Sequence, residues 1–174
     1  MLLDKIPAKL GLDEINVIIE IPMGSNPVKY EFDKESGAIF VDRFINTAMF
    51  YPCNYGFIPH TLSGDGDPID VLVISHYPVI PSSVIRARAI GVLIMEDESG
   101  ADEKIIAVPV SKLDKSFDDV KDLNDINPIL KERIVHFFEH YKDLEKGKWV
   151  KVKGFEGMNK AKMLIEEALH RSGH

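Results

Sequence analysis

The sequence contains a single cysteine and no long apolar run. Cys53 has no partner for an internal disulfide, which suits a reducing compartment, and we expect a buried, unreactive thiol. The longest stretch without a formal charge, residues 71–85, includes His76 and two prolines. It falls short of the roughly 18 apolar residues that a membrane span needs. The first five residues lack the basic-then-apolar pattern of a signal peptide. We therefore expect a cytoplasmic protein without a membrane partner.

Positive charge is also in deficit, with 21 lysines and arginines against 28 aspartates and glutamates, a net charge of −7. An acidic protein repels nucleic acid at long range, so we expect no nucleic-acid partner. The same charge would oppose a phosphate substrate unless the acids serve locally as metal ligands. The chain has neither repeats nor low-complexity tracts. Its 174 residues, 45% of them hydrophobic, predict one domain over residues 1–174.

Alternating and β-branched segments predict a β-rich first part of the chain. The turn residues 33–37 join two of these segments into a hairpin. The expected strands are 15–21, 28–32, 38–41, 71–74, 84–95 and 104–110, with a weaker candidate at 150–152.

Two helices are predicted in the second half. The first begins with Asn127 as its cap and Pro128 at its first position, and the second starts near Asn159. Apolar residues at helical spacing mark one face of each: Leu130, Ile134, Phe137, Phe138 and Tyr141, then Ala161, Leu164, Ile165, Ala168 and Leu169. Five or six short strands with two helices predict a mainly β barrel with flanking helices, of the α+β class.

The sharpest local feature is a cluster of three carboxylates, Asp65, Asp67 and Asp70, within six residues and just before an apolar strand. Like charges held this close repel one another unless a cation or a proton intervenes. Oxygen ligands favour a hard cation such as Mg²⁺, Mn²⁺ or Ca²⁺. Gly66 and Pro68 can bend the loop so that the acids converge. The plainer alternative is a solvated turn whose acids only make local hydrogen bonds.

Other candidate residues are less distinctive, and each has a plain structural explanation. A second acidic run, residues 96–103, reads as a polar hairpin tip, the interpretation we adopt for Glu96, Glu98 and Glu103. Period two places Lys29 and Glu31 on one strand face, where an ordinary ion pair is the simpler explanation. The remaining candidates are Asp97, Asp102, Lys104, Arg43, Tyr141 and Lys142.

Several functional classes can be weighed against this pattern. An EF-hand fails on spacing, because counting from Asp65 its sixth position is Asp70 instead of glycine and its twelfth is His76 instead of glutamate. A nucleic-acid-binding barrel would need a basic groove, and no Walker loop is present. His136 and His140 lack the H-E-x-x-H arrangement of zinc proteases, so a surface or subunit contact is the simpler role. A phosphohydrolase acting on nucleotides or phosphoesters stays open on residue chemistry alone.

The motif of residues 65–71 resembles the signature of the family I soluble inorganic pyrophosphatases, in their bacterial form. The likeness extends to residues 21–22, 29–31, 37–43, 50–56 and 136–150. The resemblance implies a five-stranded OB-type barrel with helices outside, assembled as a homohexamer of two stacked trimers. It also implies an inorganic diphosphatase, in which a metal-bound water attacks pyrophosphate in line without a covalent intermediate. Several Mg²⁺ ions per active site are implied, with Mn²⁺ or other divalent cations as substitutes.

The same resemblance assigns roles to individual residues. It makes Asp67 the general base, and Arg43, Tyr141 and Lys142 the catalytic groups on the departing phosphate. The implied metal ligands are Asp65, Asp70, Asp97, Asp102 and Glu31, with Glu20 in the outer acidic site. The implied substrate-binding residues are Lys29, Arg43, Tyr55, Lys104, Tyr141 and Lys142.

Overall fold

The computed structural model describes residues 3–173. Residues 1, 2 and 174 lie outside the described part, and so does the beginning of the segment tested for a signal peptide. The strands are β1 (Ile15–Ile21), β2 (Val28–Phe32), β3 (Ile39–Phe44), β4 (Asn54–Phe57), β5 (Asp70–Val73), β6 (Val84–Asp97), β7 (Gly100–Ala101), β8 (Lys104–Pro109) and β9 (Val150–Gly157). The helices are α1 (Pro128–His140) and α2 (Met158–Arg171), with short 3-10 turns η1 (Leu3–Lys5), η2 (Lys115–Phe117) and η3 (Leu123–Asp125).

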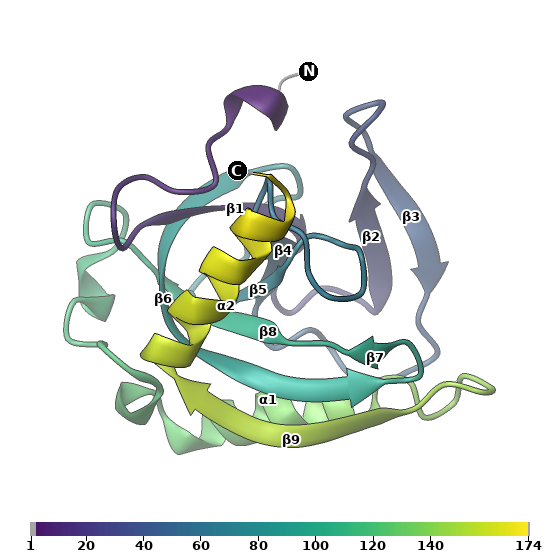
Figure 1. Cartoon of the computed structure of the whole chain (residues 1–174). Helices are drawn as coiled ribbons and strands as arrows, with labels where there is room; N and C mark the ends of the chain where they lie inside the picture. The colour runs from purple at the N-terminus through teal and green to yellow at the C-terminus, as the bar shows by residue number, and fades with distance from the viewer. Residues whose placement is uncertain (1–2, 174) are drawn as a thin grey trace.

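Five strands close into a ring in the order β1-β4-β5-β8-β6, and β6 returns to pair with β1 (Figure 1). The long β6 makes this closure possible, because its residues 84–87 pair with β1 and its residues 87–93 pair with β8. Strand β9 pairs with the later part of β6, outside the ring. The β5–β8 pair is parallel, and the other pairs in the ring are antiparallel. This ring, with both helices packed outside it, confirms the predicted mainly β, OB-type barrel.

The barrel strands are buried on both faces, which explains their almost continuous apolar sequences. In β5, Val71 and Val73 belong to a cluster with α2, where Ala161, Ile165 and Ala168 are buried. Leu72 and the following Ile74 belong to a second cluster with α1, where Ile134, Phe137 and Phe138 are buried. The predicted apolar faces of both helices are therefore the faces that pack. Cys53 is buried as expected, and burial raises the pKa of its thiol to about 12.

The structure corrects several predicted element bounds. The sequence interpretation missed β4 because its residues, Asn-Tyr-Gly-Phe, do not show the β-branched pattern of a strand. Gly56 pairs with Ile19 at a point where a Cβ atom would lie 2.0 Å from the carbonyl oxygen of Ile18. Glycine thus permits the close approach of β1 and β4. The candidate strand at 150–152 continues to Gly157, and the predicted strand at 38–41 becomes residues 39–44.

Strands β2 and β3 form a separate two-stranded sheet that stands beside the barrel (Figure 1). The pairing shifts between Lys29↔Arg43 and Tyr30↔Val41, which leaves Asp42 as an extra residue on β3. The backbone N–H of Phe32 donates a 2.8 Å hydrogen bond to Glu20 on β1 and ties the hairpin to the barrel. Among residues 3–173, no helix has the length and apolar character needed to cross a membrane.

Candidate active site

The parallel pairing of β5 and β8 gathers acids from distant parts of the chain. Asp70, the first residue of β5, lies opposite Lys104, the first residue of β8. Asp102 precedes Lys104 by two residues, and Asp97 ends the neighbouring strand β6. The loop before β5 brings Asp65 and Asp67 to the same end of the barrel. Strand pairing thus joins the two acidic runs that are separate in sequence.

These groups line two adjoining cavities. The first, of about 280 Å³, is bordered by Lys29, Arg43, Tyr55, Asp65, Asp67, Asp70, Asp97, Asp102, Lys104, Tyr141 and Lys142. The second, of about 400 Å³, lies between the hairpin and the barrel, shares Lys29, Tyr55 and the first three aspartates, and adds Glu20 and Glu31. Every site residue predicted from the sequence therefore borders one cavity or both.

Lys104 lies at the centre of the acidic group. Its Nζ donates to Asp70 Oδ2 at 2.6 Å, to Asp102 Oδ1 at 2.8 Å and to the hydroxyl of Tyr55 at 3.1 Å. The Lys104 side chain is only 5% exposed, and burial alone would lower its pKa. The charge of Asp70, followed by Tyr55 and Asp102, raises it well above normal. Burial raises the pKa of Asp102, and the charge of Asp70 adds to that effect. Lys104 therefore supplies the positive charge that lets these acids lie together.

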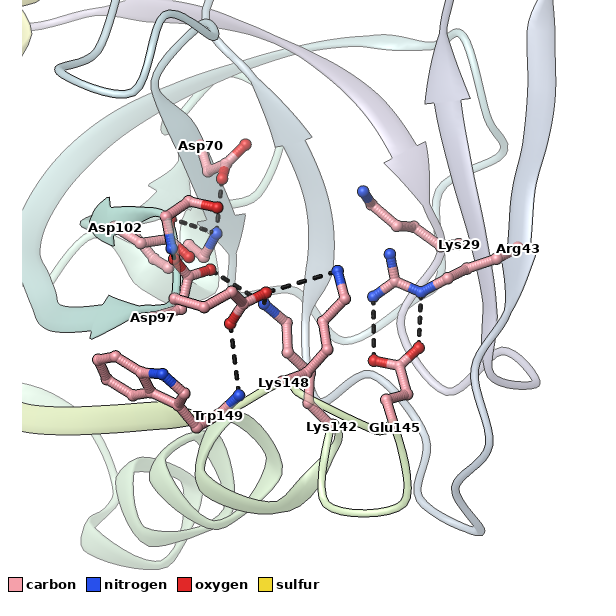
Figure 2. Close-up of polar contacts among 12 residues, drawn as sticks. Lys29, Arg43, Asp70, Asp97, Asp102, Lys142, Glu145, Lys148 and Trp149 are labelled. Atoms are coloured by element: carbon pink, nitrogen blue, oxygen red, sulfur yellow. Dashed lines mark hydrogen bonds and ion pairs between the residues drawn. The ribbon is translucent and has the colours of Figure 1, made fainter.

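A second lysine, Lys142, supplies positive charge to the neighbouring Asp97. Lys142 Nζ donates to Asp97 Oδ2 at 2.9 Å and lies 3.6 Å from Glu98 Oε1 (Figure 2). Burial would raise the pKa of Asp97, but the hydrogen bond from Lys142 lowers it below its ordinary value. Glu98 also accepts from the backbone N–H of Trp149 at 3.3 Å and lies 3.4 Å from Lys148 Nζ. Glu98 lies in the turn between β6 and β7, so the hairpin-tip interpretation is confirmed, and its carboxylate also contacts two lysines at the cavity edge.

The β2–β3 hairpin carries two cations, and each pairs with an acid that does not border either cavity. Lys29 Nζ lies 3.4 Å from Asp42 Oδ2. Arg43 Nε donates to Glu145 Oε1 at 2.8 Å and Nη2 donates to Oε2 at 3.3 Å (Figure 2). Sequence reasoning missed Asp42 and Glu145. Nothing in their spacing marks them, because the Arg43–Glu145 pair joins residues 102 positions apart.

Asp65 and Asp67 differ from Asp70, Asp97 and Asp102 because, within residues 3–173, neither carboxylate forms an ion pair. The backbone N–H of Asp67 donates to Asp65 Oδ1 at 3.1 Å. Burial and the charges of Asp67 and Asp102 raise the pKa of Asp65 above its ordinary value. Asp67 itself is exposed to solvent at the cavity wall. Its carboxylate is free to accept a proton or a hydrogen bond from a bound molecule.

The donor chemistry of the cavity fits a hard divalent cation. Among the residues that the structure describes, its wall carries five aspartates and neither a cysteine nor a histidine. Oxygen donors of this kind are the ligands of Mg²⁺ and similar ions. In the described part of the chain, no three acidic, histidine or cysteine side chains converge on one point. The ammonium groups of Lys104 and Lys142 lie next to three of these carboxylates.

Glu20 is nearly buried between the barrel and the hairpin. Burial is the main cause that raises the pKa of its carboxyl from 4.5 to about 8, and the charges of Asp70 and Glu31 add to it. The hydrogen bond from the Phe32 N–H acts in the opposite direction but does not cancel the shift.

The barrel and the cavity together define the class of protein. It is an OB-type barrel whose pocket contains acids that can bind cations and, beside them, lysines and an arginine that can bind oxyanions.

Comparisons with known proteins agree with this class. The family model described as inorganic pyrophosphatase matches residues 17–172. Proteins named inorganic pyrophosphatase from Rickettsia bellii and Escherichia coli K12 are 72% and 61% identical, over 98% and 99% of this chain and 98% of each relative. A solved structure from Anaplasma phagocytophilum, titled inorganic phosphatase, has a TM-score of 0.95 at 47% identity and covers 98% of this chain and 100% of its own.

The chain therefore belongs to the inorganic pyrophosphatase family.

We expect the Glu20→Gln substitution to change how stability depends on pH in the metal-free protein. Because the pKa of Glu20 is about 8 in the folded state against 4.5 ordinarily, its contribution is fully present below pH 4.5 and is lost as the pH rises through 8. Glutamine stays neutral and can still accept from Phe32. Urea unfolding in chelator at pH 5, 7 and 9 should therefore show the variant gaining stability over the wild type as the pH rises. A difference that is constant with pH would contradict the shifted pKa.

Proposed function

We propose that this protein is an inorganic diphosphatase that hydrolyses pyrophosphate to two phosphates with Mg²⁺ as its cofactor. The observation that carries the proposal is the mixed lining of one cavity, where five aspartates stand beside Lys29, Arg43 and Lys142. A purely anionic pocket would repel pyrophosphate, and a purely basic one would not hold cations. The names of the relatives in the same family point to the same substrate.

The metal ligands that we propose are Asp65, Asp70, Asp97 and Asp102, with Glu31 at the hairpin side and Glu20 behind it. Bound Mg²⁺ would neutralise phosphate oxygens and make the attacking water more acidic, and Mn²⁺ or another divalent cation could replace it. Lys104 contacts two of these acids, so it would reach both the acids and a phosphate oxygen bound beside them. These residues match the donor preference of the metal.

Asp67 is the general base in this proposal. It borders both cavities, forms no ion pair among residues 3–173 and follows Asp65 by two positions. A carboxylate free of a cationic partner can take the proton of the attacking water as the water approaches phosphorus. No covalent intermediate is needed, because the water itself is the nucleophile.

The cations on the opposite wall bind the substrate and stabilise the phosphate that leaves. Arg43 offers a planar fork and Lys142 a point charge, and the hydroxyl of Tyr141 can donate to an oxygen on which negative charge develops. Lys29, Tyr55 and Lys104 hold the other phosphate group. All six residues line the 280 Å³ cavity, so one pyrophosphate can reach them together.

We further propose a single domain over residues 1–174, a cytoplasmic location and assembly as a homohexamer of two trimers. Strands β1 and β9, from opposite ends of the chain, both pair with β6, which supports the single domain. The exposed apolar side chains of Phe40, Val41 and Phe44 on β3 supply surface for contacts between subunits.

Phosphate release from pyrophosphate is the direct test of the function. We expect fast release with Mg²⁺, loss of release with excess chelator, and far slower release from ATP and p-nitrophenyl phosphate. Hydrolysis of ATP at a similar rate would instead favour a broader phosphohydrolase. No release from folded protein with Mg²⁺ present would exclude the proposed activity.

The Asp67→Asn substitution should lower kcat by about 10²-fold or more, because an amide cannot accept the proton of the water. The side chain is exposed and forms no ion pair in the described structure, so we expect the fold and Mg²⁺ binding to persist. Steady-state kinetics at saturating Mg²⁺ would measure the loss. An unchanged kcat would remove Asp67 from the mechanism.

Asp70→Asn should weaken Mg²⁺ binding more than Asp67→Asn does, because Asp70 is half-buried among the other acids and Asp67 faces solvent. The rise of the thermal unfolding midpoint with Mg²⁺ concentration reports the affinity without any turnover. We expect the titration of Asp70→Asn to shift to higher Mg²⁺ than that of Asp67→Asn, which provides the matched charge change. Identical titrations would contradict the assignment of Asp70 as a ligand.

A further inference from the structure

We infer that Glu145 is a positioning residue for the reaction: it holds one edge of the Arg43 guanidinium so that the other edge faces the substrate cavity. This inference rests on the proposed function. Arg43 borders the 280 Å³ cavity, whereas Glu145 is absent from its lining. Glu145 therefore acts on a bound phosphate only through Arg43.

The contact between the two side chains is a two-point clamp. Nε and Nη2 of Arg43 reach the two carboxylate oxygens of Glu145 at 2.8 and 3.3 Å. A guanidinium has two edges that can each bind a pair of oxygens, and this clamp uses the edge that contains Nε. The other edge, formed by Nη1 and Nη2, still has N–H groups that can donate hydrogen bonds to a phosphate. Among residues 3–173, the one polar contact that Nη1 makes is long, 3.4 Å to Asp42, so this edge is held weakly.

The position of Glu145 is set by the turn that follows α1. The backbone N–H of Glu145 donates to the carbonyl of Lys142 at 3.0 Å, and the N–H of Lys148 donates to the carbonyl of Glu145 at 3.2 Å. Gly147 adopts a φ of 77°, which lets the chain turn back toward β9. The same turn thus carries Lys142 to Asp97 and Glu145 to Arg43.

Arg43 needs such support because it lies on the hairpin and not on the barrel. The β2–β3 sheet is separate from the barrel sheet, and a long arginine side chain has many rotamers. The clamp links this sheet to the turn that carries Lys142, and Figure 2 shows Glu145 and Lys29 on opposite sides of the guanidinium. With side-chain exposures of 27% for Arg43 and 15% for Glu145, the pair is only partly open to solvent. Pre-ordering of Arg43 before substrate binds would reduce the entropy lost on binding.

The test compares Glu145→Gln with the wild type and with Glu132→Gln, a matched change at an exposed glutamate on α1. We expect Glu145→Gln to lower kcat/KM for magnesium pyrophosphate by about tenfold, because a glutamine offers one acceptor in place of two charged ones. Glu132→Gln should leave kcat/KM unchanged. Thermal unfolding midpoints, measured beside the kinetics, show whether the variants are folded.

A double-mutant cycle separates positioning from a structural role. In the Arg43→Lys background the Glu145→Gln change should alter kcat/KM by less than about twofold, because lysine has no second edge to orient. An equal loss in both backgrounds would show that Glu145 acts independently of Arg43 and would overturn the inference. An unchanged or higher kcat/KM for Glu145→Gln alone would also overturn it, since Glu145 would then be idle or would compete with substrate. If the wild type releases no phosphate, the proposed function fails and the inference fails with it; if only the comparison fails, the function stands.

Discussion

The repulsion among the acids at one end of the barrel is the constraint on which the rest of the site depends. Asp70 and Asp102 both contact Lys104, whose ammonium is almost fully buried. Removing one partner from a buried charge group costs about 3–5 kcal/mol, because the remaining charge is left without compensation. The ammonium thus makes an acidic cavity compatible with a folded barrel. It also contacts the side chains that we propose as metal ligands.

The barrel supplies the rigidity that such a charge group requires. Lys104 and Asp70 are opposite each other in the parallel β5–β8 pair, and the residues that follow in both strands are buried. A close-packed sheet of this kind resists the small displacements that would separate the charges. Asp65 and Asp67, which form no ion pair among residues 3–173, lie in the loop before β5, where they are exposed to solvent.

The cations of the site come from two parts of the fold, the barrel side and the β2–β3 hairpin, and they pair with different acids. Lys104 and Lys142 pair with the aspartates themselves, whereas Lys29 and Arg43 reach the cavity from the hairpin and pair with Asp42 and Glu145. In the described part of the chain, Lys29 and Arg43 therefore form no ion pair with the five aspartates that border the cavity. Pyrophosphate, a compact polyanion, would then meet positive charge from both the barrel and the hairpin.

The sequence by itself determined the parts of this protein that depend on local pattern. The period of Val28 to Phe32 gave the hairpin strand, Asn127 and Pro128 gave the start of α1, and the cluster Asp65, Asp67 and Asp70 indicated the site. Likeness to a known family, and not spacing, extended the site to scattered residues such as Lys29 and Tyr55. Strand β4 was missed because a close approach of β1 at Gly56, and not strand propensity, sets its conformation.

Only the tertiary structure decided which charges meet. Asp70 and Lys104 are 34 residues apart and come together through parallel strand pairing, while Arg43 and Glu145 are 102 apart and meet where the hairpin faces the turn after α1. An isolated glutamate in a surface turn carries no local sign that it will hold an arginine. The attraction between two charges depends on their distance in space. Which charges come close is therefore decided by the fold and not by their separation along the sequence.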